Sequence, residues 1–164
     1  MYIGGKPVIS AEPRPVQLPY DGSTVGTIYQ ATKEQVDAAV TAAVAAAPIM
    51  REMTLDERST ILRKAYQKLL DARDEMAMAV SSETGKPIKE ARLEVERSAM
   101  TLLFSSEEAH RLHGEVVPMD ASPAGKGHWA MTVREPLGVI ASGCRLTHFS
   151  AGWEAGLGRV SPLT

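Results

Sequence analysis

Residues 134–141 read Arg134-Glu135-Pro136-Leu137-Gly138-Val139-Ile140-Ala141, and they say most about the architecture of this chain. Pro136 restricts Glu135 to an extended conformation, so the residues before it leave a strand. The following run, 137–141, is short, apolar and bounded by glycine, which is typical of a strand buried in a parallel sheet. We assign no chemistry to these residues.

Working outward from this stretch, the first helix lies far upstream. We expect it to begin after Thr32, which forms a capping-box pattern with Gln35. Its apolar residues recur at helical spacing and predict one apolar stripe, made of Val36, Ala39, Val40, Ala43 and Val44. We expect Pro48 to end this helix, because proline removes a helical hydrogen bond.

Two more helical blocks follow. The second begins after Thr54, with Glu57 in the matching capping position, and bends near residues 71–74. Gly85 stops it, and the third block runs from about Pro87 to Leu112. The apolar positions of the second block predict a buried face made of Ile61, Leu62, Ala65, Leu69 and Leu70.

Turn residues predict short strands at both ends of the helical region. Gly4-Gly5 and Asp21-Gly22 are hairpin turns within residues 1–30. A glycine- and proline-containing loop predicts a second hairpin, Glu115–Arg134. The strands expected around Gly4-Gly5 and within the second hairpin are 2–3, 8–9, 115–119 and 128–134.

Four stretches in this order resemble a known family. They are Tyr2–Lys6 with Pro19–Gly26, Glu57-Arg58, Glu83-Thr84-Gly85-Lys86-Pro87, and Arg134–Val139. Residues 1–141 resemble the N-terminal part of an NAD(P)-dependent aldehyde dehydrogenase, and 143–164 do not resemble that family. The segment 112–118 resembles the subgroup that acts on small polar aldehydes.

The resemblance implies an incomplete α/β fold. Residues 1–142 would be a partial N-terminal domain, with helices, β-hairpins including 115–134, and the first strand of a dinucleotide-binding sheet. Residues 143–164 would be a divergent tail, which we expect to be irregular because glycines interrupt it and no apolar periodicity persists.

Members of the family oxidise an aldehyde to an acid or an acyl thioester and pass hydride to NAD or NADP. A cysteine thiolate attacks, an asparagine and a backbone N–H hold the oxyanion, and a glutamate activates water. The family's aromatic-Asn-Pro segment would follow residue 141, but here Phe149 is followed by Ser150 and the chain contains no asparagine. We therefore predict no catalytic and no cofactor-binding residue in this chain, and no bound NAD or NADP.

The residues themselves offer other chemistries, each with a simpler interpretation. Cys144, His148 and Glu154 form a superficial nucleophile set, but no oxyanion donor accompanies them, so an incidental thiol is favoured. His110 and His113 are spaced for a metal but lack a third ligand, and histidine also suits a helix C-terminus. We predict no metal site.

Gly85-Lys86 invites comparison with a phosphate loop. The preceding glycine of such a loop is missing, so we interpret the pair as a helix stop and restart.

The composition of the chain limits the remaining classes of function and partner. The chain has 164 residues, 44% of them hydrophobic, and a formal net charge of −2. No basic cluster stands out and aromatics are 5%, so we expect no nucleic-acid partner. One cysteine, no signal-peptide core and no apolar run long enough to span a bilayer lead us to expect a cytoplasmic protein without a membrane partner.

Three hypotheses of function remain open. The chain is a truncated aldehyde dehydrogenase without activity of its own, with a tail from a shifted reading frame; or an interaction module that forms homo-oligomers through hairpin 115–134; or one part of a split enzyme. In the intact family the small-molecule partner is an aldehyde. In each case we expect exposed apolar surface and marginal stability, because a single strand cannot complete a parallel sheet.

Overall fold

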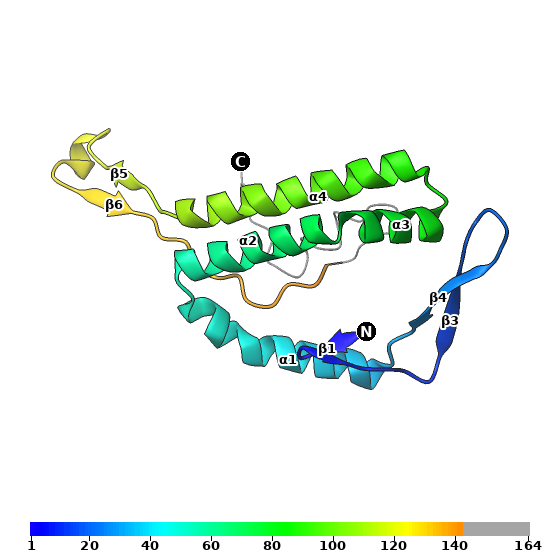
Figure 1. The fold of residues 1–164 in the computed structure, drawn as a ribbon. Helices are drawn as coiled ribbons and strands as arrows, with labels where there is room; N and C mark the ends of the chain where they lie inside the picture. The colour runs from blue at the N-terminus through cyan, green and yellow to red at the C-terminus, as the bar shows by residue number, and fades with distance from the viewer. Residues whose placement is uncertain (143–164) are drawn as a thin grey trace.

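The computed structural model describes residues 1–142, and its largest feature is a set of helices with a β-hairpin at either end (Figure 1). The helices are α1 (Lys33–Glu52), α2 (Leu55–Asp71), α3 (Arg73–Thr84) and α4 (Ile88–Glu108). The strands are β1 (Tyr2–Ile3), β2 (Lys6–Pro7), β3 (Pro13–Gln17), β4 (Thr24–Tyr29), β5 (Val116–Pro118) and β6 (Trp129–Met131). Two short 3₁₀ turns complete the described part, Ala109–Arg111 and Pro123–Gly125.

The core lies where α2 and α3 pack against α4, which runs back along both of them (Figure 1). Val95 is the largest apolar side chain that is completely buried, and the larger Leu69 and Leu102 are buried almost as fully. Small residues let the helices approach closely. The buried cluster consists of Leu69, Ala77, Val80, Ala91, Val95, Ala99 and Leu102.

The helix boundaries largely follow the predicted caps. Thr32 and Thr54 both form complete capping boxes, with Gln35 and Glu57. The predicted bend separates α2 from α3 at Ala72. Gly85 ends α3 in a left-handed conformation, with φ of 71°, as a helix stop requires.

The prediction that Pro48 ends the first helix is wrong, because α1 continues to Glu52. Proline removes only its own N–H from the hydrogen-bond ladder. The turn beyond it gains other partners: the Arg58 side chain donates to the carbonyl of Met50 and, at 3.3 Å, to that of Met53. These contacts stabilise the last turn of α1.

The apolar stripe of α1 is left exposed, as expected for a chain whose described residues lack the elements to cover it. No residue of α1, all of which is described, is buried, and Val36, Val40 and Val44 are 50–57% exposed. On α2, Ile61 is exposed whereas Leu69 lies in the core. The spacing predicted an apolar face correctly, but the described residues provide α1 with little that could cover it.

The segment 137–141 does not form the predicted buried strand. It has no strand assignment, and Leu137 is 88% exposed. A parallel strand acquires its hydrogen bonds from neighbours, and within residues 1–142 every sheet consists of two antiparallel strands. The predicted irregular tail, 143–164, lies outside the described residues.

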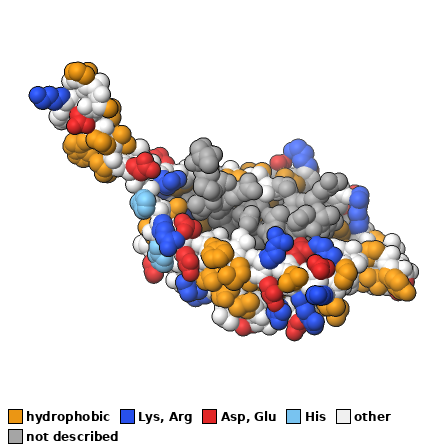
Figure 2. Space-filling view, turned by 90° about the horizontal axis from the view of Figure 1, so that it is seen from above, with side chains coloured by type: hydrophobic (Ala, Val, Ile, Leu, Met, Phe, Trp, Pro, Cys, Tyr) orange, Lys and Arg blue, Asp and Glu red, His pale blue; other side chains and the backbone are white. Residues whose placement is uncertain are grey.

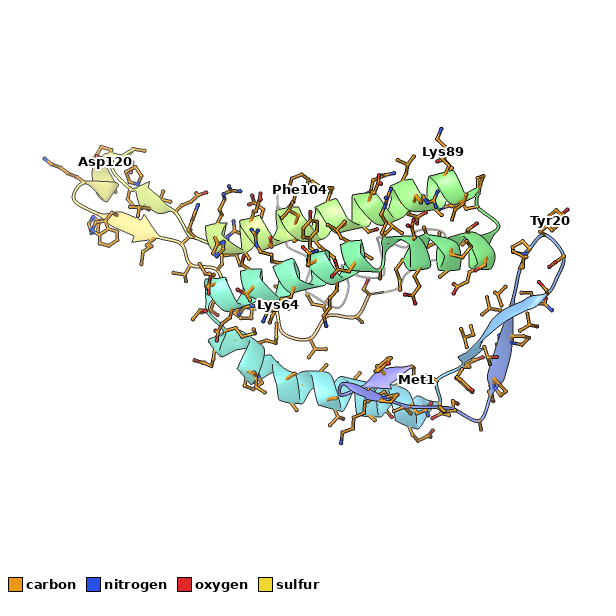
Figure 3. The ribbon with its side chains drawn as sticks, viewed as in Figure 1. Met1, Tyr20, Lys64, Lys89, Phe104 and Asp120 are labelled. Atoms are coloured by element: carbon orange, nitrogen blue, oxygen red, sulfur yellow. The ribbon has the colours of Figure 1, made fainter. Side chains whose placement is uncertain are left out.

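The hairpins are shorter than predicted. Gly4 and Gly5 both have positive φ, so the turn pairs Ile3 with Lys6 and places β2 at Lys6–Pro7 rather than at residues 8–9. The 115–134 hairpin is confirmed, with its paired residues limited to β5 and β6. The β3–β4 hairpin is also confirmed, and Tyr20 lies at its tip (Figure 3).

Candidate functional site

The family-like pair Glu57-Arg58 builds the joint between α1 and α2. Glu57 accepts hydrogen bonds from the Thr54 backbone N–H at 2.8 Å and from its hydroxyl at 2.9 Å, and these bonds lower the pKa of Glu57. The neighbouring Arg58 donates to the carbonyl of Met50 in the last turn of α1 and to that of Met53, which follows the helix. Glu57-Arg58 therefore links the end of α1 to the start of α2.

The family-like stretch Glu83–Pro87 builds the joint between α3 and α4. A Cβ added at Gly85 would lie 3.3 Å from the Pro19 ring, so this glycine both ends the helix and receives the β3–β4 hairpin. The Ser81 hydroxyl donates to the Lys86 carbonyl at 2.7 Å, and the Lys86 ammonium pairs with Glu94. Lys86 is thus an ion-pair partner within a helix junction, consistent with the predicted stop and restart.

The third joint is the root of the β5–β6 hairpin. A Cβ at Gly114 would lie 1.6 Å from the Thr132 carbonyl oxygen, which leaves space for glycine alone. The Glu115 N–H donates to the Thr132 hydroxyl at 2.8 Å, and the Thr132 N–H donates to the Glu115 carbonyl at 2.9 Å. Arg134, the first residue of the stretch Arg134–Val139, donates to the His113 carbonyl at 3.2 Å.

A groove of about 300 Å³ lies between α1, β1 and the segment 139–141. Its described lining is mostly apolar and contains no carboxylate side chain, imidazole or thiol. The lining residues are Met1, Tyr2, Ile3, Ala31, Gln35, Val36, Ala39, Val40, Ala43, Val139, Ile140 and Ala141. This surface can bury apolar groups, and its only titratable groups among the described lining residues are the Tyr2 phenol and the Met1 amine.

The two histidines considered as ligands are not brought together. The His110 Nε2 atom lies 3.8 Å from an Asp56 carboxylate oxygen at the start of α2. The His113 ring lies beside its neighbour's carbonyl, with Nδ1 3.3 Å from the Gly114 oxygen. Within residues 1–142 no group of three or more His, Cys, Asp and Glu could hold a metal ion.

The remaining candidates lie outside the described residues. Cys144, His148 and Glu154 belong to this part of the chain, as do Phe149 and Ser150. In the described part, no single helix combines the length and apolar composition needed to cross a bilayer. Only α1 and α2 taken as a pair pass that test, and they are bent by 119° at their junction.

Three residues have structural roles that no sequence pattern indicated. Arg58, Thr132 and Arg134 act through backbone carbonyls or N–H groups that are remote in sequence or in a neighbouring element. No periodicity or spacing rule identifies such contacts. The only signal was that Arg58 and Arg134 stand inside stretches that resemble a family.

Comparisons with known proteins agree with those stretches. The model of the family described as "Aldehyde dehydrogenase family" matches residues 9–142 of this chain. A 3-sulfolactaldehyde dehydrogenase of Priestia aryabhattai is 39% identical over 142 residues, which are 87% of this chain and 29% of that protein. The chain therefore spans under a third of that relative's length.

Solved structures give the same result. Aldehyde dehydrogenase 21 of Physcomitrella patens, in complex with its reaction product succinate, superposes with a TM-score of 0.74 and 37% identity, over 79% of this chain and 27% of that one. PnpE in complex with nicotinamide adenine dinucleotide superposes with a TM-score of 0.69 and 33% identity, over 73% and 25%.

Proposed function

Because the chain belongs to the aldehyde dehydrogenase family, we propose that it is the N-terminal structural segment of an NAD(P)-dependent enzyme and does not oxidise aldehydes by itself. The observation that supports this proposal is the role of three family-like stretches. Those around Glu57-Arg58, Gly85 and Arg134 hold joints between helices and hairpins. They position elements and supply no reacting group.

The chemistry of the family reaction supports this view. Attack on a carbonyl requires a thiolate, and the developing oxyanion requires donors that are already in place. The chain contains no asparagine, and its single cysteine, Cys144, follows the residues that match the family. The apolar groove beside Val139 and Ile140 adds no carboxylate, imidazole or thiol among its described lining residues.

The described residues do not fit a dinucleotide. Pyrophosphate is bound by backbone N–H groups at the start of a helix that follows a parallel strand. Here the first turns of α1 and α2 are occupied by their own Thr32 and Thr54 caps. The segment 137–141 forms no parallel pair within the described residues. We therefore propose that this chain alone does not hold NAD or NADP.

Purified chain tests the proposal directly. It is incubated with 3-sulfolactaldehyde or with succinate semialdehyde, each with NAD and with NADP, and the absorbance of reduced nicotinamide is followed. We expect no reduction above the rate without protein. The proposal would be overturned by a rate of nicotinamide reduction that is proportional to the concentration of the chain and that persists when the purification tag is replaced.

Reconstitution would identify the aldehyde. The relative's name and the other protein's bound succinate suggest a short aldehyde that carries a sulfonate or carboxylate. Co-expression with the remaining part of the Priestia enzyme is expected to restore activity on such an aldehyde and not on an uncharged one of equal length. Activity on neither would contradict the split-enzyme alternative.

A second function, assembly, is favoured by the β5–β6 hairpin. Hydrophobic side chains gather over this arm, which projects from the helices (Figure 2). Val116 and Trp129 are each 68% exposed, and Val133 equally so. Apolar side chains on a projecting arm favour burial against a partner. Light scattering on the purified chain tests this: a monomer at micromolar concentration would contradict it.

A further inference from the structure

We infer that the segment 146–153 of this chain docks on the apolar groove between α1, β1 and residues 139–141, and covers it with Leu146, Phe149 and Trp153. These three residues lie outside the described part of the chain, so the support comes from the groove itself and from the amino-acid sequence that follows it. Such docking is independent of the catalytic and assembly roles discussed above.

The groove presents apolar side chains to solvent. Val36 and Val40 of α1 are each 50% exposed, and Val139 and Ile140 of the segment 139–141 are 45% and 47% exposed. Removing apolar surface from water is favourable, so a segment that reaches the groove gains by covering it. At about 300 Å³ the groove is at the small end of the range of binding pockets, which suits a few side chains.

The polar groups of the lining favour an apolar occupant. The Gln35 side chain accepts from the Thr32 N–H at 3.0 Å and donates to the Ile9 carbonyl at 3.4 Å, so both ends of its amide are engaged. The Met1 amine is the only formal charge among the described lining residues, and it donates to the Val8 carbonyl at 3.2 Å. A charged occupant would find little to pair with in this lining, whereas an apolar side chain requires no partner.

The chain itself delivers the occupant to the groove. Ala141 belongs to the lining, and Leu146 follows it by five residues, which span at most about 18 Å. Docking of a tethered group is intramolecular, and a short linker gives it an effective concentration in the millimolar range. A second copy of the chain, or a free ligand, at micromolar concentration has no such advantage.

The composition of the segment suits an apolar surface. Residues 143–164 contain one of the two phenylalanines of the chain and one of its two tryptophans, Phe149 and Trp153. Segments that remain solvated are poor in aromatic residues, and each aromatic side chain can bury about 150–250 Å². Gly156 and Gly158 raise the entropic cost of ordering the residues beyond Trp153, which favours 146–153 as the docking segment.

Trp153 can report on its own surroundings. In the variant Trp129→Phe it is the single tryptophan of the chain. Its emission maximum and its quenching by acrylamide are compared with those of the free peptide 143–164. We expect emission at shorter wavelength and weaker quenching in the chain, at every protein concentration. Emission equal to that of the peptide would overturn the inference. A shift that appears only as the concentration rises would assign the contact to a second copy, and would overturn it as well.

Substitutions on α1 test whether the groove is the docking surface. Val40→Asp places a carboxylate in the lining, and Ile49→Asp, on the same helix at a residue 70% exposed and outside the described lining, is the matched control. Cleavage of a transiently opened segment follows the population of its open form. Because burying an unpaired carboxylate is costly, trypsin cleavage after Arg145 should accelerate about tenfold in Val40→Asp and stay unchanged in Ile49→Asp.

Circular dichroism checks that both aspartate variants keep their helices. In the Trp129→Phe background, Val40→Asp should also move the Trp153 emission towards that of the free peptide. Equal cleavage rates in the two aspartate variants would overturn the groove as the place of contact.

Discussion

α4 and α1 are both amphipathic helices of similar length, yet only α4 is built into a core. The stripe of α4 faces α2 and α3 and includes residues that are fully or almost fully buried, such as Val95 and Leu102. The stripe of α1 is half exposed throughout. The comparison teaches that apolar periodicity specifies a face and not what covers it.

The same contrast separates the helical core from the β5–β6 arm. The core is stabilised by burial contributed from several elements. The arm depends on its root contacts at Gly114 and Thr132 and exposes Trp129 and Met131. Substitutions in the core should therefore affect the whole molecule, whereas substitutions in the arm should have local effects.

The largest expected effect breaks the core. Leu102→Ala removes a side chain that is 6% exposed and should lower the free energy of unfolding by about 2–5 kcal/mol. Leu93→Ala on the same helix, at 46% exposed, is the matched control and should cost about 1 kcal/mol or less. Urea titration followed by circular dichroism measures both. Equal losses would show that α4 does not have one buried face.

The next effect detaches the arm. Gly114→Ala places a methyl group against the Thr132 carbonyl and should cost about 1–3 kcal/mol, confined to the hairpin root. Amide hydrogen exchange should accelerate at Glu115 and Thr132 while the exchange of α4 is unchanged. Gly26→Ala, at a site with nothing within 4 Å of the new Cβ, is the control. Faster exchange throughout α4 would contradict the separation of arm and core.

A smaller effect concerns the joint between the core and α1. Thr54→Ala removes the capping hydroxyl of α2 and should cost about 1 kcal/mol. Thr41→Ala, in the middle of α1, removes no cap and should cost less. Thermal unfolding of the two variants compares them directly, and the reverse order would show that the α2 cap contributes little.

The smallest expected effect is a change in how the stability of the same joint depends on pH. Hydrogen bonds from the Thr54 N–H and hydroxyl hold the pKa of Glu57 below its ordinary value of 4.5. The carboxylate therefore stabilises the fold above pH 4.5, and this contribution is lost as the pH falls through the lowered pKa. Glu57→Gln keeps a capping-box residue but cannot titrate. It should show a weaker loss of stability on acidification, and an unchanged pH profile would argue against this role.

Sequence reasoning was most successful where the cause is local. Thr32 and Thr54 form their predicted caps, Gly85 ends its helix, and the turn at Asp21-Gly22 forms a hairpin. It was wrong at Pro48, where Arg58 from the next helix stabilises the turn beyond the proline. No local rule includes a side chain that arrives from another element.

The candidate site likewise has features that could be predicted from the sequence and features that could not. The family-like stretches could be identified from their order in the chain, but their roles as joints required the contacts of Arg58, Gly85 and Arg134. The predicted strand at 137–141 shows the limit most clearly. An apolar run has the composition of a buried strand, but its hydrogen bonds belong to neighbours.

The starts of α1 and α2, the end of α3, the turns of the hairpins and the family resemblance could all be inferred from the amino-acid sequence, because caps, glycines and motif order act over a few residues at a time. Which apolar faces are covered, and whether the run 137–141 pairs as a strand, became clear only from the tertiary contacts. Burial and strand pairing are properties of two surfaces that meet, and one stretch of sequence specifies only one of them.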